Sequence, residues 1–518
     1  MSKLSHLLSF VDVDEVADED QTQATLSKQQ VDAVMNAPIF SGLVDKFVNL
    51  NLSSDGLTTA QLSPQYGLIG IREAGPEPTH SPEDRLIIAN MNIPWSAFIC
   101  GSQGAGKSHT LSCLLENAIV AENAAGKLPS PLAGMVMHYD NYASYNTTQV
   151  CEAAYLCSSG IPVTVLVSPS NIWAMKRLYS NLPGLKPGAP RPKVLPLYLK
   201  ESQLDISRTL KLMAVSPDSN STPLYMEVVI NIAREMAMEG PAFTYTEFCR
   251  RLENTAWARG QDGPLKLRLQ LLDSFISPSA QSRSTRPAAA RDDIWAFEPG
   301  TLTIIDLSDP FINSDDACTL FSIGLSIFLE ERNKCGRVVV LDEAHKFLIQ
   351  SGEAKLLTDD LTSIIRQQRH TGTRVLIATQ EPTLSPELMD LANVTFVHRF
   401  LSPSWYEILK KHLAAASRQD SGDKNSLFDT IVALQTGEAL LFCPTAYVDV
   451  EESLDNRKGV KPLTSGYMKV KIRKRLTVDG GKSMMATETM TNGSDQVAAD
   501  EVPMHVVTAR DRRLGILS

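Results

Sequence analysis

The chain has 518 residues, 43% of them hydrophobic, so it is long enough for two to four folded domains with apolar cores. It carries 59 acidic and 49 basic side chains, a formal net charge of −10, which excludes the broad positive field of a general nucleic-acid coat protein. No run of about 18 apolar residues occurs, and the first 20 residues lack a secretory pattern, so we expect neither membrane insertion nor secretion.

Cysteine usage indicates a reducing compartment. The eight cysteines include no C-x-x-C pair, and most of them lie inside apolar runs, as free buried thiols do. We therefore expect no zinc site and an intracellular location in the cytoplasm, with the nucleus left open. The cysteines are Cys100, Cys113, Cys151, Cys157, Cys249, Cys318, Cys335 and Cys443.

Residues 1–65 predict a short N-terminal extension. They begin rich in acids, and residues 27–50 then place apolar side chains at helical spacing, which predicts one amphipathic helix packed on a neighbour. Over residues 66–185, short apolar runs alternate with helical stretches. Such alternation predicts the first part of a parallel α/β sheet.

Residues 186–292 have a helical pattern and predict an insertion into the sheet. Thr244 precedes Glu247 by three residues, which is the spacing of a capping box at the start of a helix. The flanking stretches 184–193 and 277–293 are rich in Pro, Ser, Ala and Arg, so we expect exposed loops there.

Strand-like runs return over residues 293–445 and predict the second part of the same sheet. Residues 446–518 form a C-terminal extension. Its basic stretch KVKIRKR alternates as a strand does, which favours a structural role over nuclear import, and the polar residues after it predict a loose tail.

The stretch GSQGAGKS satisfies the spacing of a phosphate-binding loop, and it lies between an apolar run and a helical stretch. Glycines let backbone N–H groups turn toward the phosphates, and the helix N-terminus adds its positive dipole end. Lys107 reaches the β- and γ-phosphates and Ser108 ligates Mg²⁺, so ATP and Mg²⁺ are the expected ligands. The predicted nucleotide-binding residues are Gly101, Ser102, Gln103, Gly104, Ala105, Gly106, Lys107, Ser108 and His109.

A carboxylate on a neighbouring strand is the second requirement of this chemistry, and Asp306 and Asp342 both qualify. Only Asp342 is followed by a second acid, so we expect Asp342 to hold the Mg²⁺ shell and Glu343 to polarise the attacking water as general base. Asp306 is then a structural residue at a strand end. Asp140 ends another apolar run and is a further candidate for the Mg²⁺ shell.

A third strand pattern, RVLIATQEP, ends in Thr379 and Gln380. A polar side chain at this point can contact the γ-phosphate or the attacking water. Gln380 therefore joins Lys107 and Glu343 as a predicted catalytic residue.

The order of these stretches resembles that of the HerA/FtsK superfamily and looks closest to its HerA-like branch, over roughly residues 66–480. The resemblance implies a P-loop NTPase fold of the RecA-like, additional-strand and catalytic-Glu type, with a largely parallel α/β sheet flanked by helices. It also implies a homo-oligomeric ring, usually a hexamer, that hydrolyses ATP, moves duplex DNA through its pore as a translocase or helicase, and meets a nuclease partner. The stretches are GSQGAGKS, HYDNYASY, GTLTIIDLSD, VVVLDEAHKFL, IIRQQRHTGTRVLIATQEPT and VTFVHRFLS.

In rings of this kind an arginine of the neighbouring subunit stabilises the charge that develops on the γ-phosphate. Arg369 and Arg399 are the arginines that we favour for this catalytic role. Arg366, Arg473 and Arg475 stay open as alternatives, because the sequence does not choose among them.

Three features depart from the family pattern. The residues before Tyr66 are too few and too helical to form the β-barrel with which HerA proteins usually begin. The family's TQRP is TQEP here, so a negative charge replaces a positive one at Glu381. No long basic run with interleaved aromatics marks a DNA track, so DNA as substrate is implied by the resemblance alone.

Three functions follow from these observations. The first is a ring motor on duplex DNA, in which symmetry multiplies a few basic contacts per subunit. The second is a slow nucleotide switch of the same fold that acts on a protein partner, which the acidic balance and the missing barrel favour. The third is a small-molecule kinase, which the pair Asp342 and Glu343 disfavours because a water-activating acid favours hydrolysis.

Overall fold

The computed structural model places the chain in two units, Met1–Gly481 and Lys482–Ser518, and all described residues lie in the first. The acidic N-terminus, the stretch 277–292 and the tail after residue 480 lie outside the described residues. The structure describes residues 26, 28–54, 63–74, 81–141, 149–212, 224–240, 243–255, 257, 262–276, 293–330, 335–349, 351–381, 384–413, 416, 426–452 and 458–480.

The described residues include a parallel sheet with the strand order β8–β7–β9–β6–β10–β11–β4–β12. Its central strands are buried along their whole length, because helices cover both faces of the sheet. Strands buried on both faces consist of nearly continuous apolar runs. This confirms the predicted fold class. The strands are β4 (Ala97–Cys100), β6 (Ala133–His138), β7 (Val163–Val167), β8 (Lys193–Pro196), β9 (Leu302–Asp306), β10 (Arg337–Leu341), β11 (Thr373–Thr379) and β12 (Val394–Val397).

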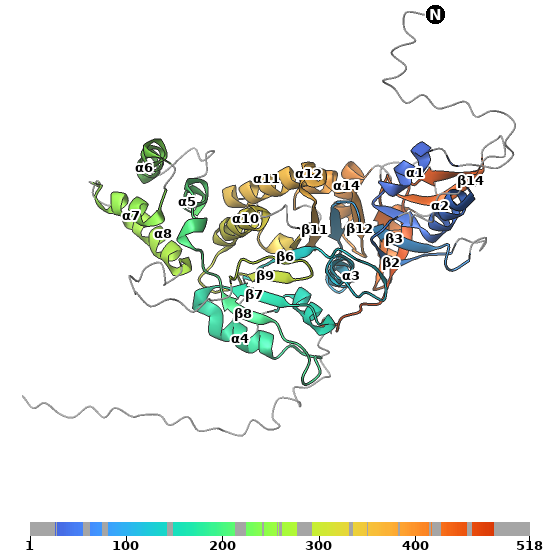
Figure 1. Cartoon of the computed structure of the whole chain (residues 1–518), viewed down its shortest axis with the longest axis horizontal. Coiled ribbons are helices and arrows are strands. Elements are labelled where there is room, and N and C mark those ends of the chain that lie inside the picture. Colours follow the sequence, from blue (N-terminus) through green and yellow to red (C-terminus); the bar gives the residue numbers. More distant parts are fainter. Residues whose placement is uncertain are drawn as a thin grey trace, which may run out of the picture. The chain divides into compact units, whose positions relative to one another are not determined.

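Helices cover both faces of this sheet. Val338 and Val340 of β10 pack into a core shared with α3 and α4, whereas Val339 and Leu341 pack into one shared with α10 and α11. This alternation follows from the two-residue period of a strand. Figure 1 shows α10 and α11 along one side of β6 and β9, and α4 along the other. The helices are α3 (Lys107–Ile119), α4 (Ile172–Ser180), α10 (Ser314–Glu330) and α11 (Gly352–Arg366).

Strand β11 lies between β4 and β10, with Thr379 in register with Cys100, and Ile377 in register with Leu341. The carboxyl ends of parallel strands meet at one edge of a sheet. The phosphate-binding loop after β4, the acids after β10 and Gln380 after β11 therefore arrive at the same edge, which we call the nucleotide edge.

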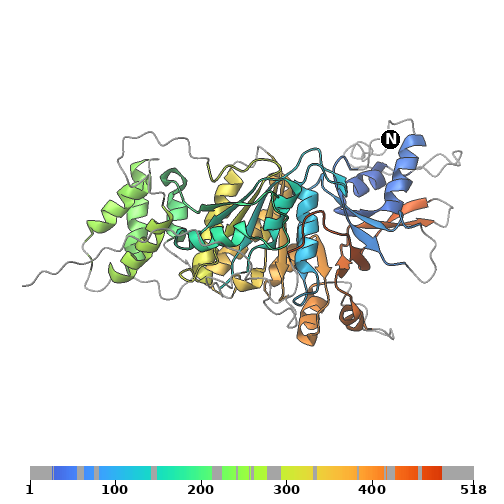
Figure 2. The ribbon, with the colours of Figure 1, turned by 90° about the horizontal axis from the view of Figure 1, so that it is seen from below.

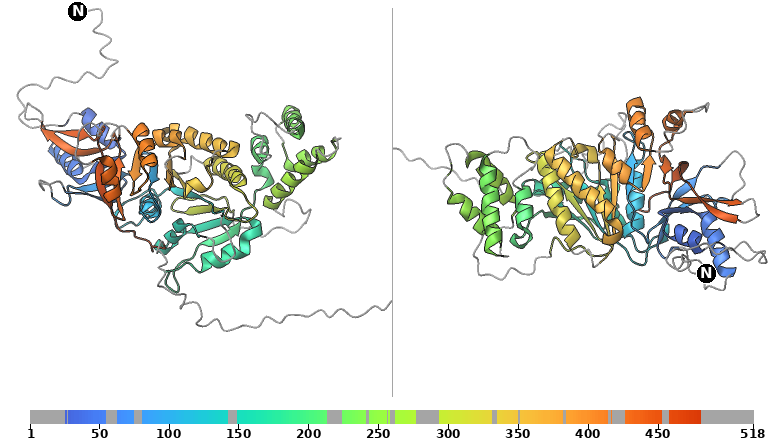
Figure 3. Two further views of the ribbon diagram at one scale, coloured as in Figure 1. Left: turned by 180° about the vertical axis from the view of Figure 1, so that it is seen from behind. Right: turned by 90° about the horizontal axis from the view of Figure 1, so that it is seen from above.

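A second part of the sheet, with the order β15–β14–β1–β3–β2–β16, combines both ends of the chain and joins the core through β13. Figures 2 and 3 show the blue N-terminal elements beside the orange-red C-terminal strands. All its pairings except β1 with β14 are antiparallel. The strands are β1 (Ile39–Ser41), β2 (Tyr66–Arg72), β3 (Leu86–Asn90), β13 (Glu438–Phe442), β14 (Tyr447–Glu452), β15 (Lys458–Pro462) and β16 (Met468–Ile472), and β5 (Gly126–Lys127) pairs with β2.

The predicted start of the parallel sheet at residue 66 is therefore wrong, since the parallel strands begin with β4 at Ala97. Strand β2 pairs antiparallel with β3, and with β16 on its other side. The basic stretch KVKIRKR does contain a strand, β16, as predicted.

The single amphipathic helix predicted over residues 27–50 is two helices with a strand between them. Helix α1 (Lys28–Met35) ends before Pro38, because proline lacks a backbone N–H and disfavours helical geometry at the preceding residue. Strand β1 follows, and then helix α2 (Gly42–Ser54). Phe40, Val44 and Val48 belong to a small core of their own.

The helical insertion starts after β8, later than the predicted boundary at residue 186. Strand β8 pairs in parallel with β7 and belongs to the sheet. Thr244 Oγ1 accepts the N–H of Glu247 at 3.3 Å, which confirms the predicted helix start. The insertion, green in Figure 3, consists of α5 (Ile206–Leu212), α6 (Leu224–Glu239), α7 (Tyr245–Glu253) and α8 (Asp262–Phe275).

Shorter elements complete the described part of the chain. No helix in that part is long and apolar enough to cross a membrane. All eight cysteines are free thiols. The shorter elements are η2 (Glu152–Ser159), η3 (Pro169–Asn171), η4 (Glu201–Gln203), η5 (Ala344–Lys346), α12 (Gln368–Thr371), α13 (Pro386–Leu391), α14 (Pro403–His412) and α16 (Leu427–Ala433).

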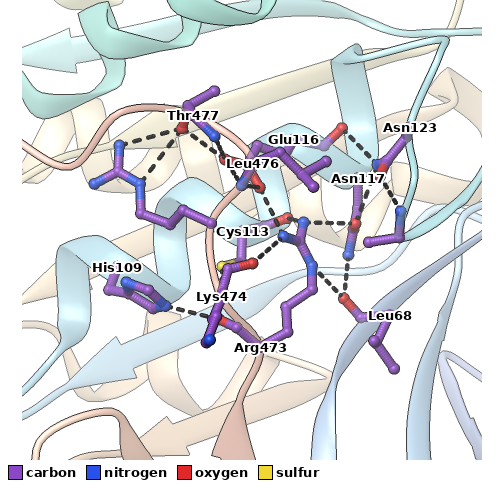
Figure 4. A network of polar contacts seen from close by, with 12 residues as sticks. Leu68, His109, Cys113, Glu116, Asn117, Asn123, Arg473, Lys474, Leu476 and Thr477 are labelled. Carbon is purple, nitrogen blue, oxygen red and sulfur yellow. Dashed lines mark hydrogen bonds and ion pairs between the residues drawn. The ribbon is translucent and has the colours of Figure 1, made fainter. Parts of the chain in front are cut away.

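Residues 473–479, which we call the C-terminal strap, connect the second part of the sheet to helix α3 (Figure 4). The buried guanidinium of Arg473 donates to Glu116 Oε2 at 2.8 Å and to Asn117 Oδ1 at 3.0 Å. It also donates to the carbonyls of Leu68 at 2.9 Å and Cys113 at 3.0 Å. One side chain thus joins β2, α3 and the strap.

The Glu116 carboxylate is fully buried and is the common acceptor of this network. Besides Arg473, the backbone N–H groups of Leu476 and Thr477 donate to it at 3.0 Å and 2.9 Å. These hydrogen bonds lower the pKa of Glu116, although burial alone raises it. The helix that follows the phosphate-binding loop is therefore anchored through an ionised acid.

We expect Arg473→Ala to destabilise the chain by about 3–5 kcal/mol, because it leaves a buried carboxylate unpaired. The midpoint of chemical denaturation, followed by circular dichroism, measures this effect. Lys461→Ala is the control, since Lys461 pairs with Glu451 at the surface and its loss should leave the midpoint nearly unchanged. An equally small change in both variants would show that the strap does not anchor α3.

Candidate functional site

The phosphate-binding loop joins β4 to α3 through glycines with unusual backbone angles. Gly104 and Gly106 have φ values of 73° and 114°, in the region that favours glycine. Within the described chain the amides of Gly104, Gly106 and Ser108 have no protein acceptor. Free N–H groups at a helix N-terminus suit phosphate oxygens, so these residues fit a bound nucleotide.

Backbone contacts from β12 and β13 hold this loop in place. The N–H and the hydroxyl of Ser102 both donate to the Arg399 carbonyl, at 2.9 Å and 2.8 Å. His398 lies so close that a Cβ added to Gly101 would come within 2.6 Å of its Cβ. Gly101 also has a φ of 151°, so both its backbone conformation and the lack of space beside it require glycine.

His398 is a neutral imidazole in a fixed tautomer. Its Nδ1 lies 2.8 Å from the Glu438 carbonyl, which only accepts, so Nδ1–H donates and Nε2 accepts from the Thr110 hydroxyl at 3.0 Å. Burial lowers the pKa of His398 to about 4, against the opposing effect of the Glu438 carbonyl. The ring links the phosphate-binding helix to β13.

The Lys107 side chain is buried and its Nζ donates to the Ser102 carbonyl at 3.1 Å. Burial lowers the pKa of Lys107, and the negative charges of Glu343 and Asp342 oppose that effect. The predicted phosphate-binding lysine therefore lies in the field of both predicted acids.

Glu343 is held in a strained conformation by side chains from two elements. Its φ and ψ are 50° and 45°, a left-handed geometry that costs a residue with a side chain on the order of 1–3 kcal/mol. Its Oε2 accepts from Gln380 Nε2 at 3.1 Å and lies 3.4 Å from His345 Nδ1. The residue after β11 thus supplies the amide that orients the predicted general base.

Asp342 lies beside a histidine and a cysteine, both buried. Its Oδ2 is 3.3 Å from His138 Nδ1 and 3.7 Å from Cys151 Sγ. Burial alone raises the pKa of Asp342, but His138 brings it below its usual value. Burial alone lowers the pKa of His138, but the carboxylates of Asp306 and Asp342 raise it to about 9. The two groups therefore form a buried ion pair.

The other two acids have partners of their own. Asp306 is fully buried and accepts from the Tyr179 hydroxyl at 2.5 Å and from the Ser308 N–H at 3.0 Å, which agrees with a structural role. Asp140 lies 3.5 Å from Lys346 Nζ. Asp140 thus forms an ion pair with Lys346, which lies in the segment after β10.

Two of the five candidate arginines are used inside the subunit. The Arg473 guanidinium donates its hydrogen bonds to α3 and β2, as described above. Arg475 pairs with Glu152 and with Asp479, and its side chain is 2% exposed. Neither side chain is available to a neighbouring subunit, so the alternative that one of them is the trans-acting arginine is wrong.

Arg366 and Arg369 are exposed, and they lie away from the nucleotide edge. Gln368, in the same short helix as Arg369, accepts from Ser96 at 2.7 Å and donates to Asn393 at 2.9 Å, and these two residues precede β4 and β12. The seven residues of β11, about 20 Å of strand, separate this end of the sheet from Gln380. Arg369 therefore lies far from the Lys107 of its own chain.

Arg399 follows β12 at the nucleotide edge and its side chain is half-buried. Its carbonyl already contacts the phosphate-binding loop through Ser102. His109, predicted to bind nucleotide, directs its Nε2 to the Arg473 carbonyl at 2.8 Å instead. Its imidazole thus contacts the strap.

Four residues of this site were missed by the sequence analysis: His138, Cys151, His345 and His398. Three of them are histidines that end or closely follow apolar strand runs. A histidine at that position of a parallel strand was the available signal, because those strand ends share the nucleotide edge. Cys151 had no comparable signal.

The strand order, the loop and the acid pair together define the fold of a P-loop NTPase with an additional strand. Solved structures with similar folds include VirB4 of Thermoanaerobacter pseudethanolicus, at 12% identity over 79% of this chain and 96% of that one, with a TM-score of 0.43. The plasmid coupling protein TrwB in complex with a GTP analogue has 12% identity over 80% of this chain and 96% of that one, with a TM-score of 0.40.

The genome packaging NTPase B204 from Sulfolobus turreted icosahedral virus 2 is similar to a smaller part of the chain. It has 14% identity over 36% of this chain and 78% of that one, with a TM-score of 0.21. No protein-family model and no curated protein matches the chain. Scores this low assign neither an activity nor a partner.

The neutral state of His398 predicts a pH dependence of stability. An unfolded histidine binds a proton below about pH 6.5, whereas folded His398 does so only below about 4. The free energy of unfolding should therefore fall as the pH drops from 6.5 to 4, by on the order of 3 kcal/mol from this residue. Urea denaturation of the wild type and of His398→Gln at several pH values isolates the contribution of His398. The same change of the unfolding free energy with pH in both proteins would contradict the prediction.

Proposed function

We propose that the chain hydrolyses ATP to ADP and phosphate at the nucleotide edge. Lys107 and the loop amides bind the phosphates, and Glu343 takes a proton from the attacking water. The observation that supports this most is the strained Glu343, whose carboxylate is oriented by Gln380 and shares the field of Lys107. A carboxylate that a neighbouring amide orients favours transfer of the γ-phosphoryl group to water over its transfer to the substrate of a kinase.

Mg²⁺ fits this arrangement through Ser108, in the first turn of α3, and Asp342, at the end of β10. When bound there, Mg²⁺ neutralises charge on the β- and γ-phosphates. Burial alone raises the pKa of Asp342, but the neighbouring His138 lowers it and keeps the carboxylate ionised. Asp140 is the weaker candidate because it pairs with Lys346.

We further propose that the chain acts as a homo-oligomeric ring in which Arg369 serves the neighbouring subunit. Arg369 is exposed and forms no ion pair with the described residues, while its position excludes its own nucleotide. An arginine held at the opposite edge can reach a nucleotide only across a subunit boundary. Arg399, beside the loop of its own chain, would act from within the subunit.

The use of the hydrolysis energy that we propose is movement on duplex DNA, as in the HerA-like motors that the sequence resembles. The net charge of −10 restricts DNA contacts to local basic groups, repeated by the ring. The alternative use is a slow switch on a protein partner. The two uses differ in their response to DNA.

The roles of Lys107 and Glu343 predict distinct defects. Lys107→Ala should lose ATP binding, whereas Glu343→Gln should retain ATP and lose turnover by about 100-fold or more, since it removes only the general base. Binding of a fluorescent ATP analogue and steady-state phosphate release measure the two effects. Glu387→Gln, a change at an exposed acid, is the matched control. Equal loss of binding in the first two variants would contradict the assignment.

For the motor, we expect long duplex DNA to raise ATP turnover, and higher salt to reduce that stimulation because phosphate contacts release counterions. Steady-state hydrolysis at two salt concentrations, together with the mass in solution, measures this. A ring-sized mass with stimulation supports the motor. Slow, unstimulated hydrolysis by a monomer or dimer would contradict it and support the switch.

Mixed rings test the arginine in the same assay. Arg369→Ala and Glu343→Gln subunits should each be inactive alone and regain turnover when mixed, because each supplies what the other lacks. Arg177→Ala, a change at another exposed arginine, should keep wild-type turnover. Wild-type turnover by Arg369→Ala rings would rule out Arg369.

A further inference from the structure

Three buried side chains converge behind the predicted Mg²⁺ ligand. His138 ends β6, Asp342 follows β10, and Cys151 precedes η2. One ligand atom of each residue, an imidazole nitrogen, a carboxylate oxygen and a thiol sulfur, lies within 4.8 Å of the other two. All three side chains are shielded from water. These are the donor types that bind transition metals.

Two of the three separations between these atoms match the edges of a metal coordination sphere. Zn²⁺ bonds of about 2.1 Å to nitrogen and oxygen and 2.3 Å to sulfur at tetrahedral angles place N and O about 3.4 Å apart and S and O about 3.6 Å apart. The observed distances from Asp342 Oδ2 are 3.3 Å to His138 Nδ1 and 3.7 Å to Cys151 Sγ. Asp342 is thus spaced from both other ligands as in the shell of one small cation, and the third separation lies within 4.8 Å.

A cation at this position would replace the Nδ1 proton through which His138 pairs with Asp342. The Nε2 of His138 lies 3.3 Å from the Gln149 carbonyl, which only accepts, so Nε2 carries a proton. Nδ1 is near Asp342, yet it makes no hydrogen bond of proper geometry and is fully buried. A histidine whose outer N–H donates to a carbonyl while its other nitrogen faces a carboxylate oxygen has the usual arrangement of a metal ligand.

We infer that His138 Nδ1, Cys151 Sγ and Asp342 Oδ2 form a site for a thiophilic divalent cation, with Zn²⁺ preferred. A thiolate and a carboxylate balance its two charges. Sulfur and imidazole select Zn²⁺ over Mg²⁺, which prefers six oxygen ligands. The surroundings also fit, since the Tyr179 hydroxyl accepts from the Cys151 N–H at 3.1 Å and donates to Asp306.

This site differs from the proposed Mg²⁺ site but shares Asp342 with it. The thiophilic cation takes Oδ2 and leaves the other carboxylate oxygen for the Mg²⁺ shell. The inference rests on the side-chain cluster and does not depend on ATP hydrolysis. We expected no zinc site because the sequence has no C-x-x-C pair, whereas Cys151 lies 13 residues after His138 and Asp342 lies 191 residues after Cys151.

Co²⁺ is the probe, because tetrahedral Co²⁺ bound to a thiolate absorbs in the near ultraviolet and visible ranges. The full chain, stripped with a chelator, is titrated with Co²⁺ both when folded and during refolding, since the ligand atoms are buried. We expect one Co²⁺ per chain with a thiolate charge-transfer band and tetrahedral bands, all abolished by one equivalent of Zn²⁺. Absence of the thiolate band under both loading conditions would overturn the inference.

Variants locate the site. Cys151→Ser should lose the charge-transfer band and weaken Co²⁺ binding at least about tenfold, and His138→Gln should weaken binding while retaining the band. Cys157→Ser removes another buried thiol and should change nothing. Lys107→Ala should keep the full spectrum even where nucleotide binding is lost, which separates this inference from the proposed function. An unchanged band in Cys151→Ser would also overturn the inference.

Discussion

Parallel pairing of β4, β11 and β10 is the constraint on which the rest of this structure depends. These strands come from three segments of the chain, and register fixes their carboxyl ends at one edge. Because each strand is buried on both faces, a slip by one residue would turn every side chain toward the wrong core. The apolar packing of the strands therefore determines where Lys107, Asp342 and Gln380 meet, although none of these residues contributes to that packing.

The polar groups at this edge are stable only as a set. Lys107, His138, Asp342 and Glu343 are all nearly excluded from water, and unpaired charges there would be costly. Each has a neighbour of opposite charge or a hydrogen-bond partner, and the pKa shifts of His138 and Asp342 run in the directions that keep both charged. Strain at Glu343 is tolerated because the surrounding contacts hold it.

The C-terminal strap extends this fixed geometry beyond the sheet. Arg473 and Glu116 connect the helix of the phosphate-binding loop to strands formed by both ends of the chain. Displacement of the strap would separate this buried ion pair. The two segments are more than 350 residues apart in the sequence.

The sequence alone determined the fold class and predicted the phosphate-binding loop and the acids after β10, because these depend on local periodicity and on residues at fixed spacing. It also located the N-cap at Thr244 and the strand in the C-terminal basic stretch. It failed where pairing is non-local: β2 and β3 are antiparallel, and Arg473 is an internal anchor.

Only the tertiary structure decided the surroundings of the acids. Gln380 contacts Glu343, and His138 and Cys151 contact Asp342, across strands whose neighbours are set by packing and not by sequence order. The number of residues between two strands does not tell which strands become neighbours in the sheet, because crossover connections vary in length. Spacing along the chain therefore does not predict these contacts. The chemistry of single residues was therefore readable from the sequence, and their partners were not.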